Sequence, residues 1–205
     1  MIYLLGILPI ISVPFSLPFF IAAIIPVAII QIWAIIYIID PYKYEKSYYL
    51  YFGVFGVVNT YVYFIAIQKF MYFNMGATGY MPFIIGIVLF LALIFGVNWM
   101  NWKALNSGTY YKLQQKTSIP VSWIAVGGLG YVLGQIILSF TYSDSALYSL
   151  LIVGLSIVSL FTAFCSINIH KYFFISKNMD IVKKVYPEFG LPLSERYTKR
   201  KKTKK

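Results

Sequence analysis

The sequence is poor in the residue types from which catalytic and metal sites are built. It contains one cysteine, one histidine and six acidic residues among 205. A single cysteine excludes an internal disulfide and any metal cluster held by cysteines. Cys165 and His170 are five positions apart, so on a helix they point about 140° away from each other and do not form a nucleophile pair. We therefore expect no enzymatic activity, no cofactor and no bound metal.

Charge is scarce and unevenly placed. Charged residues make up 11% of the chain and hydrophobic residues 60%, whereas a soluble domain carries roughly 25% charged residues. Eleven of the 17 lysines and arginines lie between Lys171 and Lys205. This distribution predicts one membrane domain over residues 1–175, followed by a basic and partly disordered tail over residues 176–205.

Long uncharged stretches predict the membrane spans. Four of them reach the length of about 20 residues that a helix needs to cross a bilayer, and they cover residues 47–67, 81–99, 119–140 and 146–169. The stretch before them, 2–39, is interrupted by four prolines. We expect one span over Leu17–Ile39, preceded by a short re-entrant or interfacial segment. The predicted fold class is all-α, a polytopic transmembrane helix bundle of five spans; six spans with an N-terminal hairpin is the alternative.

The loops predict the orientation. The loops are assigned to alternate sides of the membrane, starting from the tail. Sixteen lysines and arginines then fall on the side of the tail, and only Lys69, near the loop 68–80, falls on the other. Basic residues are retained on the cytoplasmic side. We therefore expect a multi-pass protein of the plasma membrane with a cytoplasmic C-terminus.

The glycine-rich stretch VGGLGYVLGQ, residues 126–135, resembles a dinucleotide-binding loop only in spacing. It lies within an uncharged run and lacks the preceding strand and the acidic residue about 20 positions later. Gly127, Gly130 and Gly134 instead share one face of a helix, as small residues at membrane helix contacts do. Ser156, Ser159 and Ala163 form a matching stripe in the last span. We expect both stripes to pack helices, within one chain or between copies.

Neutral polar residues inside the spans allow two interpretations. Gln31, Asn59, Asn98 and Gln135 could hydrogen-bond neighbouring helices or line the path of a solute. Helix bonding is the expected role, because transporter sites usually sit on broken helices in repeated halves and no repeat is visible here.

The end of the tail is strongly basic. A cluster this close to a membrane is attracted to anionic headgroups, at about 1 kcal/mol per basic residue near the surface. No aromatic-interleaved or folded reader of nucleic acid accompanies it, so nucleic-acid binding is not expected. The residues expected to contact lipid or a partner are Lys199, Arg200, Lys201, Lys202, Lys204 and Lys205.

These features predict a non-catalytic membrane protein that acts by helix packing and by binding a membrane partner or further copies of itself. Examples are an accessory subunit of a peptide-export or secretion complex and an immunity protein against a membrane-targeted toxin. The alternative is a small transporter or facilitator subunit for a neutral or amphipathic solute.

Overall fold

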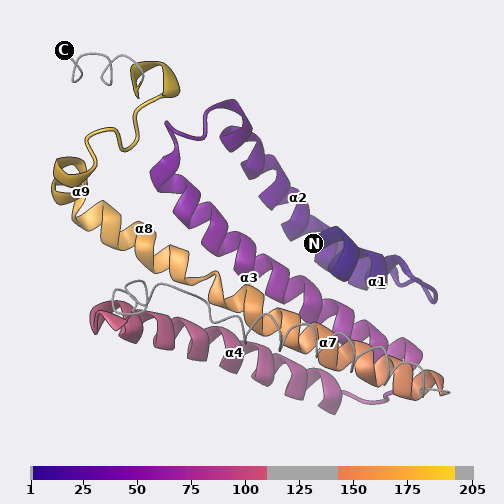
Figure 1. The fold of residues 1–205 in the computed structure, drawn as a ribbon. Coiled ribbons are helices and arrows are strands. Elements are labelled where there is room, and N and C mark those ends of the chain that lie inside the picture. The colour runs from indigo at the N-terminus through magenta and orange to yellow at the C-terminus, as the bar shows by residue number, and fades with distance from the viewer. Residues whose placement is uncertain (1, 110–142, 197–205) are drawn as a thin grey trace, which may run out of the picture.

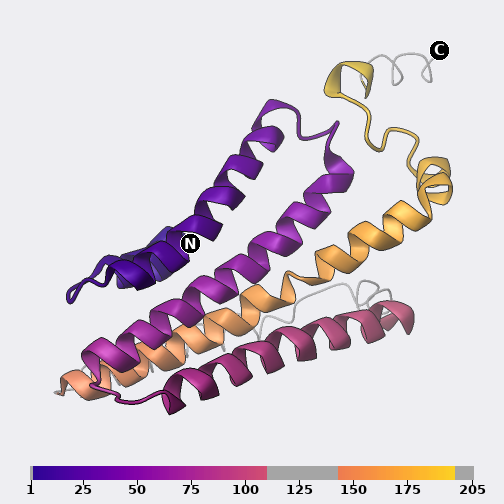
Figure 2. The same cartoon turned by 180° about the vertical axis from the view of Figure 1, so that it is seen from behind.

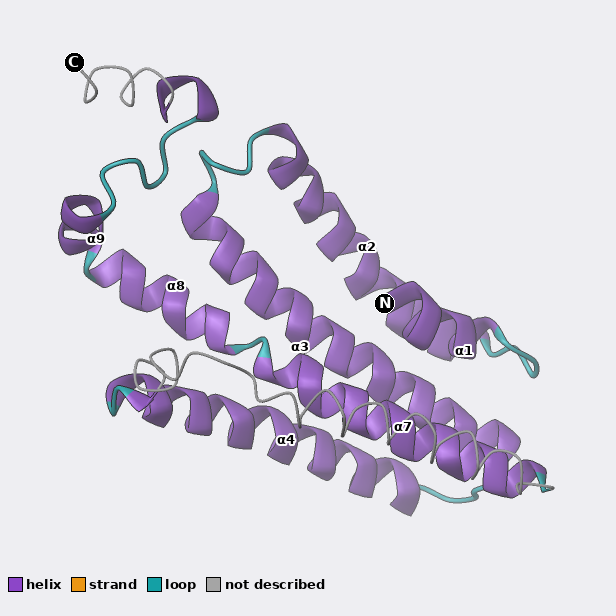
Figure 3. Cartoon of the chain, viewed as in Figure 1, coloured by secondary structure: helices purple, strands orange, loops and turns teal. Residues whose placement is uncertain are grey.

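The structure of the protein is a computed structural model that describes residues 2–109 and 143–196 (Figure 1). The regular elements in these two ranges are all helices (Figure 3). In chain order they are η1 (Ile2–Ile7), α1 (Leu8–Ile11), α2 (Leu17–Ile39), α3 (Glu45–Lys69), η2 (Phe70–Asn74), α4 (Met81–Asn106), α7 (Asp144–Phe164), α8 (Ile167–Lys177) and α9 (Met179–Val185).

Four helical stretches in the described ranges are long and apolar enough to span a membrane. They are Leu17–Ile39, Glu45–Asn74, Met81–Asn106 and Asp144–Lys177. These helices expose large apolar side chains outward; Ile38 of α2, for example, is 80% exposed. Such surfaces are costly in water and are ordinary against lipid. The predicted span over residues 119–140 lies outside the described residues.

The N-terminal helix is short and folds back on the bundle. Together η1 and α1 cover Ile2–Ile11, about 15 Å at 1.5 Å per residue, which is half the thickness of the hydrocarbon core. Ile2, Ile7 and Ile10 are buried against α2 and α3. This N-terminal helix is therefore shorter than a full membrane span.

Helix α3 is the centre of the bundle. It packs against η1, α2, α7 and α8 (Figure 2). Gly53 and Gly56 allow the backbones of α3 and the last span to approach closely, because a Cβ on Gly56 would lie 2.5 Å from Cβ of Cys165. The predicted span over 146–169 lies within the apolar helical stretch Asp144–Lys177, which consists of two helices, α7 and α8. It is divided at residues 165–166, where the amide of Ser166 bonds the carbonyl of Ala163, three residues back, at 3.0 Å.

A loop was predicted over residues 68–80, and the first half of this prediction was wrong because those residues are helical. The helix continues from α3 through η2 to Asn74, and Lys69 lies within it, fully buried. A lysine can remain there because its ammonium group finds oxygen acceptors on α1 and the turn after it.

The helices define two ends of the molecule. We call the basic end the one that holds residues 40–46, the end of α4 and residues 171–196, and the far end the one that holds residues 12–16, 75–80 and 143–146 (Figure 1). Among the described residues, every Lys and Arg except Lys69 lies at the basic end.

Candidate functional site at the basic end

An ion pair joins the start of α3 to the C-terminal segment. Glu45 is the first residue of α3, where the positive end of the helix dipole favours a carboxylate. Its Oε2 accepts from Nη2 of Arg196 at 2.5 Å and from the amide of Gly190 at 3.4 Å. The two charged residues are 151 positions apart. We name this pair the clasp.

Arg196 is held by more than the ion pair. Its Nε donates to the carbonyl of Leu191 at 3.0 Å, and its guanidinium lies 4.7 Å from the centre of the Tyr42 ring. Only 18% of the Arg196 side chain is exposed. A planar guanidinium stacked on an aromatic ring and paired with a carboxylate is a geometry that lysine cannot reproduce. The clasp therefore positions the segment from Tyr186 to Arg196 against α3.

Local sequence signals bring this segment back to α3. The side chain of Asn178 bonds the carbonyl of Phe174 and ends α8. Helix α9 then stops at Val185, two residues before Pro187. Gly190 follows with φ +73°, a conformation that glycine adopts without steric cost. These breaks turn the chain toward Glu45.

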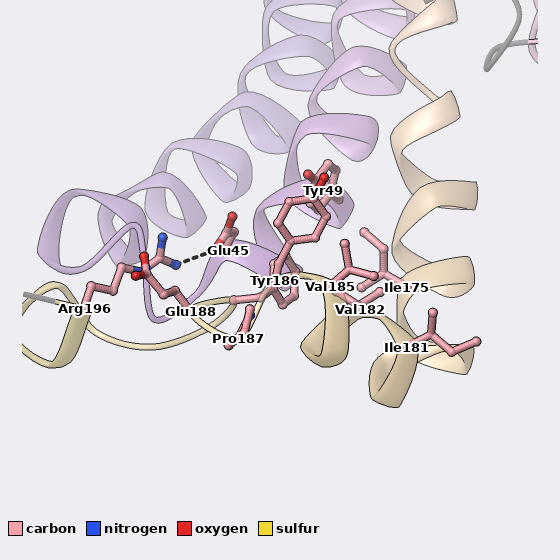
Figure 4. A pocket seen from close by; sticks show the side chains of 11 residues that line it. Glu45, Tyr49, Ile175, Ile181, Val182, Val185, Tyr186, Pro187, Glu188 and Arg196 are labelled. Carbon is pink, nitrogen blue, oxygen red and sulfur yellow. Dashed lines mark hydrogen bonds and ion pairs between the residues drawn. The ribbon is translucent and has the colours of Figure 1, made fainter. Parts of the chain in front are cut away.

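A cavity of about 770 Å³ lies behind the clasp (Figure 4). Side chains of α8 and α9 make one wall apolar, and the clasp and Glu188 supply charge. This volume lies within the range of ligand-binding clefts, about 300–1,000 Å³. Its lining residues are Glu45, Tyr49, Ile175, Ile181, Val182, Val185, Tyr186, Pro187, Glu188, Phe189 and Arg196.

The neutral polar residues singled out in the spans are not brought together. Asn98 donates to the carbonyl of Ile94 at 2.8 Å, and its Oδ1 lies 3.0 Å from Nε2 of His170, which links α4 to α8. Asn59 is buried on α3 and donates to Phe55 within that helix. Gln31 is partly buried on α2. None of these side chains lines the 770 Å³ cavity. Gln135 lies outside the described residues.

Small and hydroxylated residues line the contact between α3 and α7. Ser159 and Ala163 are buried there. Thr60 is the centre of this contact: its Oγ1 lies 2.9 Å from Oγ1 of Thr162 and 3.3 Å from the carbonyl of Ser159. Ser156 is exposed and bonds the carbonyl of Ile152 in its own helix. The remaining predicted packing and tail residues lie outside the described residues: Gly127, Gly130, Gly134, Lys199, Arg200, Lys201, Lys202, Lys204 and Lys205.

Sequence reasoning missed the residues that the structure emphasises. Glu45 resembled an ordinary loop charge because its partner is distant in sequence. Lys69 resembled a loop residue. It was, however, the one basic residue expected on its side of the membrane, and this exception to the charge pattern indicated a specific role.

Comparison with known proteins identifies no relative of this chain. No protein-family model, no curated protein and no solved structure matches this chain. Within the described ranges, no group of three His, Cys, Asp or Glu side chains is placed to hold a metal ion.

Proposed function

We propose that this protein is a non-catalytic, multi-pass protein of the plasma membrane that acts by binding a partner protein at its basic end. The observation that carries the proposal is the clasp and the cavity behind it. They form a surface with an apolar wall and fixed charges, and a strongly basic stretch follows Arg196 in the sequence. An accessory subunit of a peptide-export or secretion complex, or an immunity protein against a membrane-targeted toxin, would act in this way.

The use of the polar side chains within the bundle supports a binding role. Thr60, Ser159 and Thr162 bond between α3 and α7, and Asn98 and His170 bond between α4 and α8. Hydrogen bonds of this kind hold membrane helices together. Side chains engaged in them are not free to replace the water shell of a moving solute.

The charge distribution supports a cytoplasmic basic end. Lysines and arginines of residues 40–46, 103 and 171–196 gather there, and the positive-inside rule associates such loops with the cytoplasm. A partner would then meet the clasp in the cytoplasm or at the membrane surface. Partner side chains would enter between α8 and α9, where Ile175, Val182 and Val185 provide an apolar contact.

Site-specific photo-crosslinking in cells tests the proposal. A photoreactive residue at Val185, which lines the cavity and is 62% exposed, should capture one protein species. The matched control is Val13 at the far end, 86% exposed, which should not capture that protein. The same protein should co-purify stoichiometrically with the unmodified chain and be lost with Val185→Glu. Equal labelling from both positions, or no stoichiometric partner, would contradict partner binding at the basic end.

One observation favours a facilitator as the second candidate. Oδ1 of Asn59 and the hydroxyl of Tyr63 are buried on α3, one helical turn apart, and have no hydrogen-bond partner among the described residues. Buried polar atoms usually bind protein groups or ordered water. If they line a solute path, Asn59→Leu should abolish uptake of that solute into proteoliposomes and leave crosslinking from Val185 unchanged.

A further inference from the structure

A groove of about 500 Å³ opens between α3, α4 and α7 toward the far end. Its lining is mostly apolar and includes Phe64, Met71, Pro82, Gly86, Leu89 and Ile152. The α4 side of the groove faces outward, since Ile85 is 56% and Leu89 is 64% exposed. A molecule dissolved in the bilayer would therefore reach the groove sideways, without passing through water.

Gln68 places an unsatisfied buried polar atom at the wall of this apolar groove. The residue lines the groove and is 1% exposed, and its Oε1 has no hydrogen-bond partner among the described residues. A buried acceptor left without a donor costs about 1–3 kcal/mol. The other two polar residues of the lining already use their hydroxyl protons: Ser156 donates to Ile152, and Ser159 donates to the carbonyl of Thr60.

Gly86 on α4 allows the amide of Gln68 to occupy this position. A Cβ on Gly86 would collide with Nε2 of Gln68. The glycine therefore leaves room for a polar group at a level of the helix where its neighbours are Ile85 and Ile87. The amide of Gln68 therefore lies against α4 with its Oε1 unpaired among the described residues.

We propose that this groove binds a membrane-soluble molecule with one long apolar chain and a hydroxyl group that donates to Oε1 of Gln68. The apolar walls suit the chain, and the free acceptor requires a donor, which the hydrocarbon tail of a phospholipid lacks. Gln68 lies six residues before the end of the continuous helix at Asn74, and Gly86 lies in the second turn of α4. The hydroxyl would therefore lie one to two helical turns inside the far end of these spans, and the apolar chain would extend from there along the groove. This inference does not depend on partner binding at the basic end.

Photolabelling with a defined probe tests the inference. The full chain is reconstituted in phosphatidylglycerol vesicles with a diazirine-bearing long-chain primary alcohol. The comparison probe is the methyl ether of the same alcohol, which accepts but does not donate a hydrogen bond. The alcohol should label residues of the groove, such as Met71, Met81 or Leu89, and unlabelled alcohol should compete. The ether should label them about tenfold less, as expected for the loss of about 1.4 kcal/mol.

Two variants keep the test independent of misfolding. Gln68→Leu should reduce labelling by the alcohol to the level of the ether, whereas Gln31→Leu, the matched change on α2, should not. Leu89→Trp narrows the groove from its outward-facing side and should reduce labelling by both probes while the melting temperature stays unchanged. Equal labelling by alcohol and ether, with no effect of Gln68→Leu, would show nonspecific occupation by lipid chains and overturn the proposal. Crosslinking from position 89 to a second copy or another protein, unaffected by excess alcohol, would also overturn it.

Discussion

Nζ of Lys69, near the C-terminal end of α3, lies 2.5 Å from the carbonyl oxygen of Ser12, at the end of α1. The same Nζ donates to the carbonyl of Pro9 at 2.8 Å and to Oγ of Ser12 at 3.1 Å. Carbonyls at the end of a helix lack partners within it and carry partial negative charge. Lys69 donates to both carbonyls and links the N-terminal helix to α3; the carbonyl of Pro9 also accepts from Oγ of Ser12 at 2.6 Å.

Replacement of Lys69 by methionine should strongly destabilise the N-terminal helix. The change keeps the length of the side chain but removes the donor to the carbonyl of Ser12, at about 1–3 kcal/mol if that acceptor stays buried. The carbonyl of Pro9 keeps its bond from Oγ of Ser12. We expect a lower melting temperature in mild detergent. Lys103→Met, an exposed lysine at the basic end, should melt like the parent chain. If the two variants melt alike, the bonds of Lys69 do not hold the helix in place.

Gly56→Ala should destabilise the contact between α3 and the last span. The new Cβ would meet Cβ of Cys165 and the carbonyl oxygen of Thr162, at 2.5 and 2.6 Å, and overpacking of this kind costs about 1–3 kcal/mol. Gly96→Ala on α4 is the matched control, because nothing lies within 4 Å of its added Cβ. That variant should be neutral or slightly more stable, since alanine favours helix over glycine. Equal thermal shifts would contradict the close approach of the two helices.

Thr60→Val should weaken the hydrogen bonds between α3 and α7 with little change in shape. The lost bonds to Thr162 and Ser159 predict a loss of about 0.6 kcal/mol, the average for such bonds in membranes, and no more than about 1.7 kcal/mol, the largest value. A double-mutant cycle with Thr162→Val in a chemical denaturation assay isolates the shared part. Additive effects would show that the two hydroxyls do not interact. Ser149→Ala removes a bond within one helix on an exposed face and should have almost no effect.

Glu45→Gln should loosen the C-terminal segment. The clasp is partly exposed, with 35% of the Glu45 side chain accessible, so its loss should cost no more than about 1 kcal/mol. This corresponds to about fivefold faster trypsin cleavage after Arg196, measured by mass spectrometry. Glu195→Gln changes the exposed neighbour of Arg196 and should leave that rate nearly unchanged. High salt should accelerate cleavage of the parent chain and reduce its difference from Glu45→Gln.

Residue composition and run length were sufficient to predict the helical architecture. The span over Leu17–Ile39 has the predicted bounds, because proline at the second position and Asp40 after the end are local signals. The start of α4 at Met81 agrees with the span predicted over 81–99 from its uncharged length, and Pro82 is the second residue of the helix. A helix can span a membrane if it is long and apolar enough, and both properties can be read from a run of consecutive residues.

Interactions between residues far apart in the sequence could not be predicted from composition and run length. The burial of Lys69 depends on carbonyls some 60 positions earlier, and the clasp joins residues 151 positions apart. The last span is divided at residues 165–166, where α3 approaches it closely. The residues around Cys165 give no local signal of this approach. The unpaired Oε1 of Gln68 is evident only from the packing of the helices around it.

The sequence by itself determined a helical, membrane-compatible chain with its basic residues gathered toward the C-terminus, because hydrophobic length and net charge are sums over neighbouring residues. Only the tertiary structure decided which polar groups are satisfied. Whether a lysine, a glutamate or a glutamine finds a partner depends on the helices that pack around it. For this protein, the packing gives Lys69 three oxygen acceptors, gives Glu45 an arginine partner and leaves Oε1 of Gln68 without a donor among the described residues.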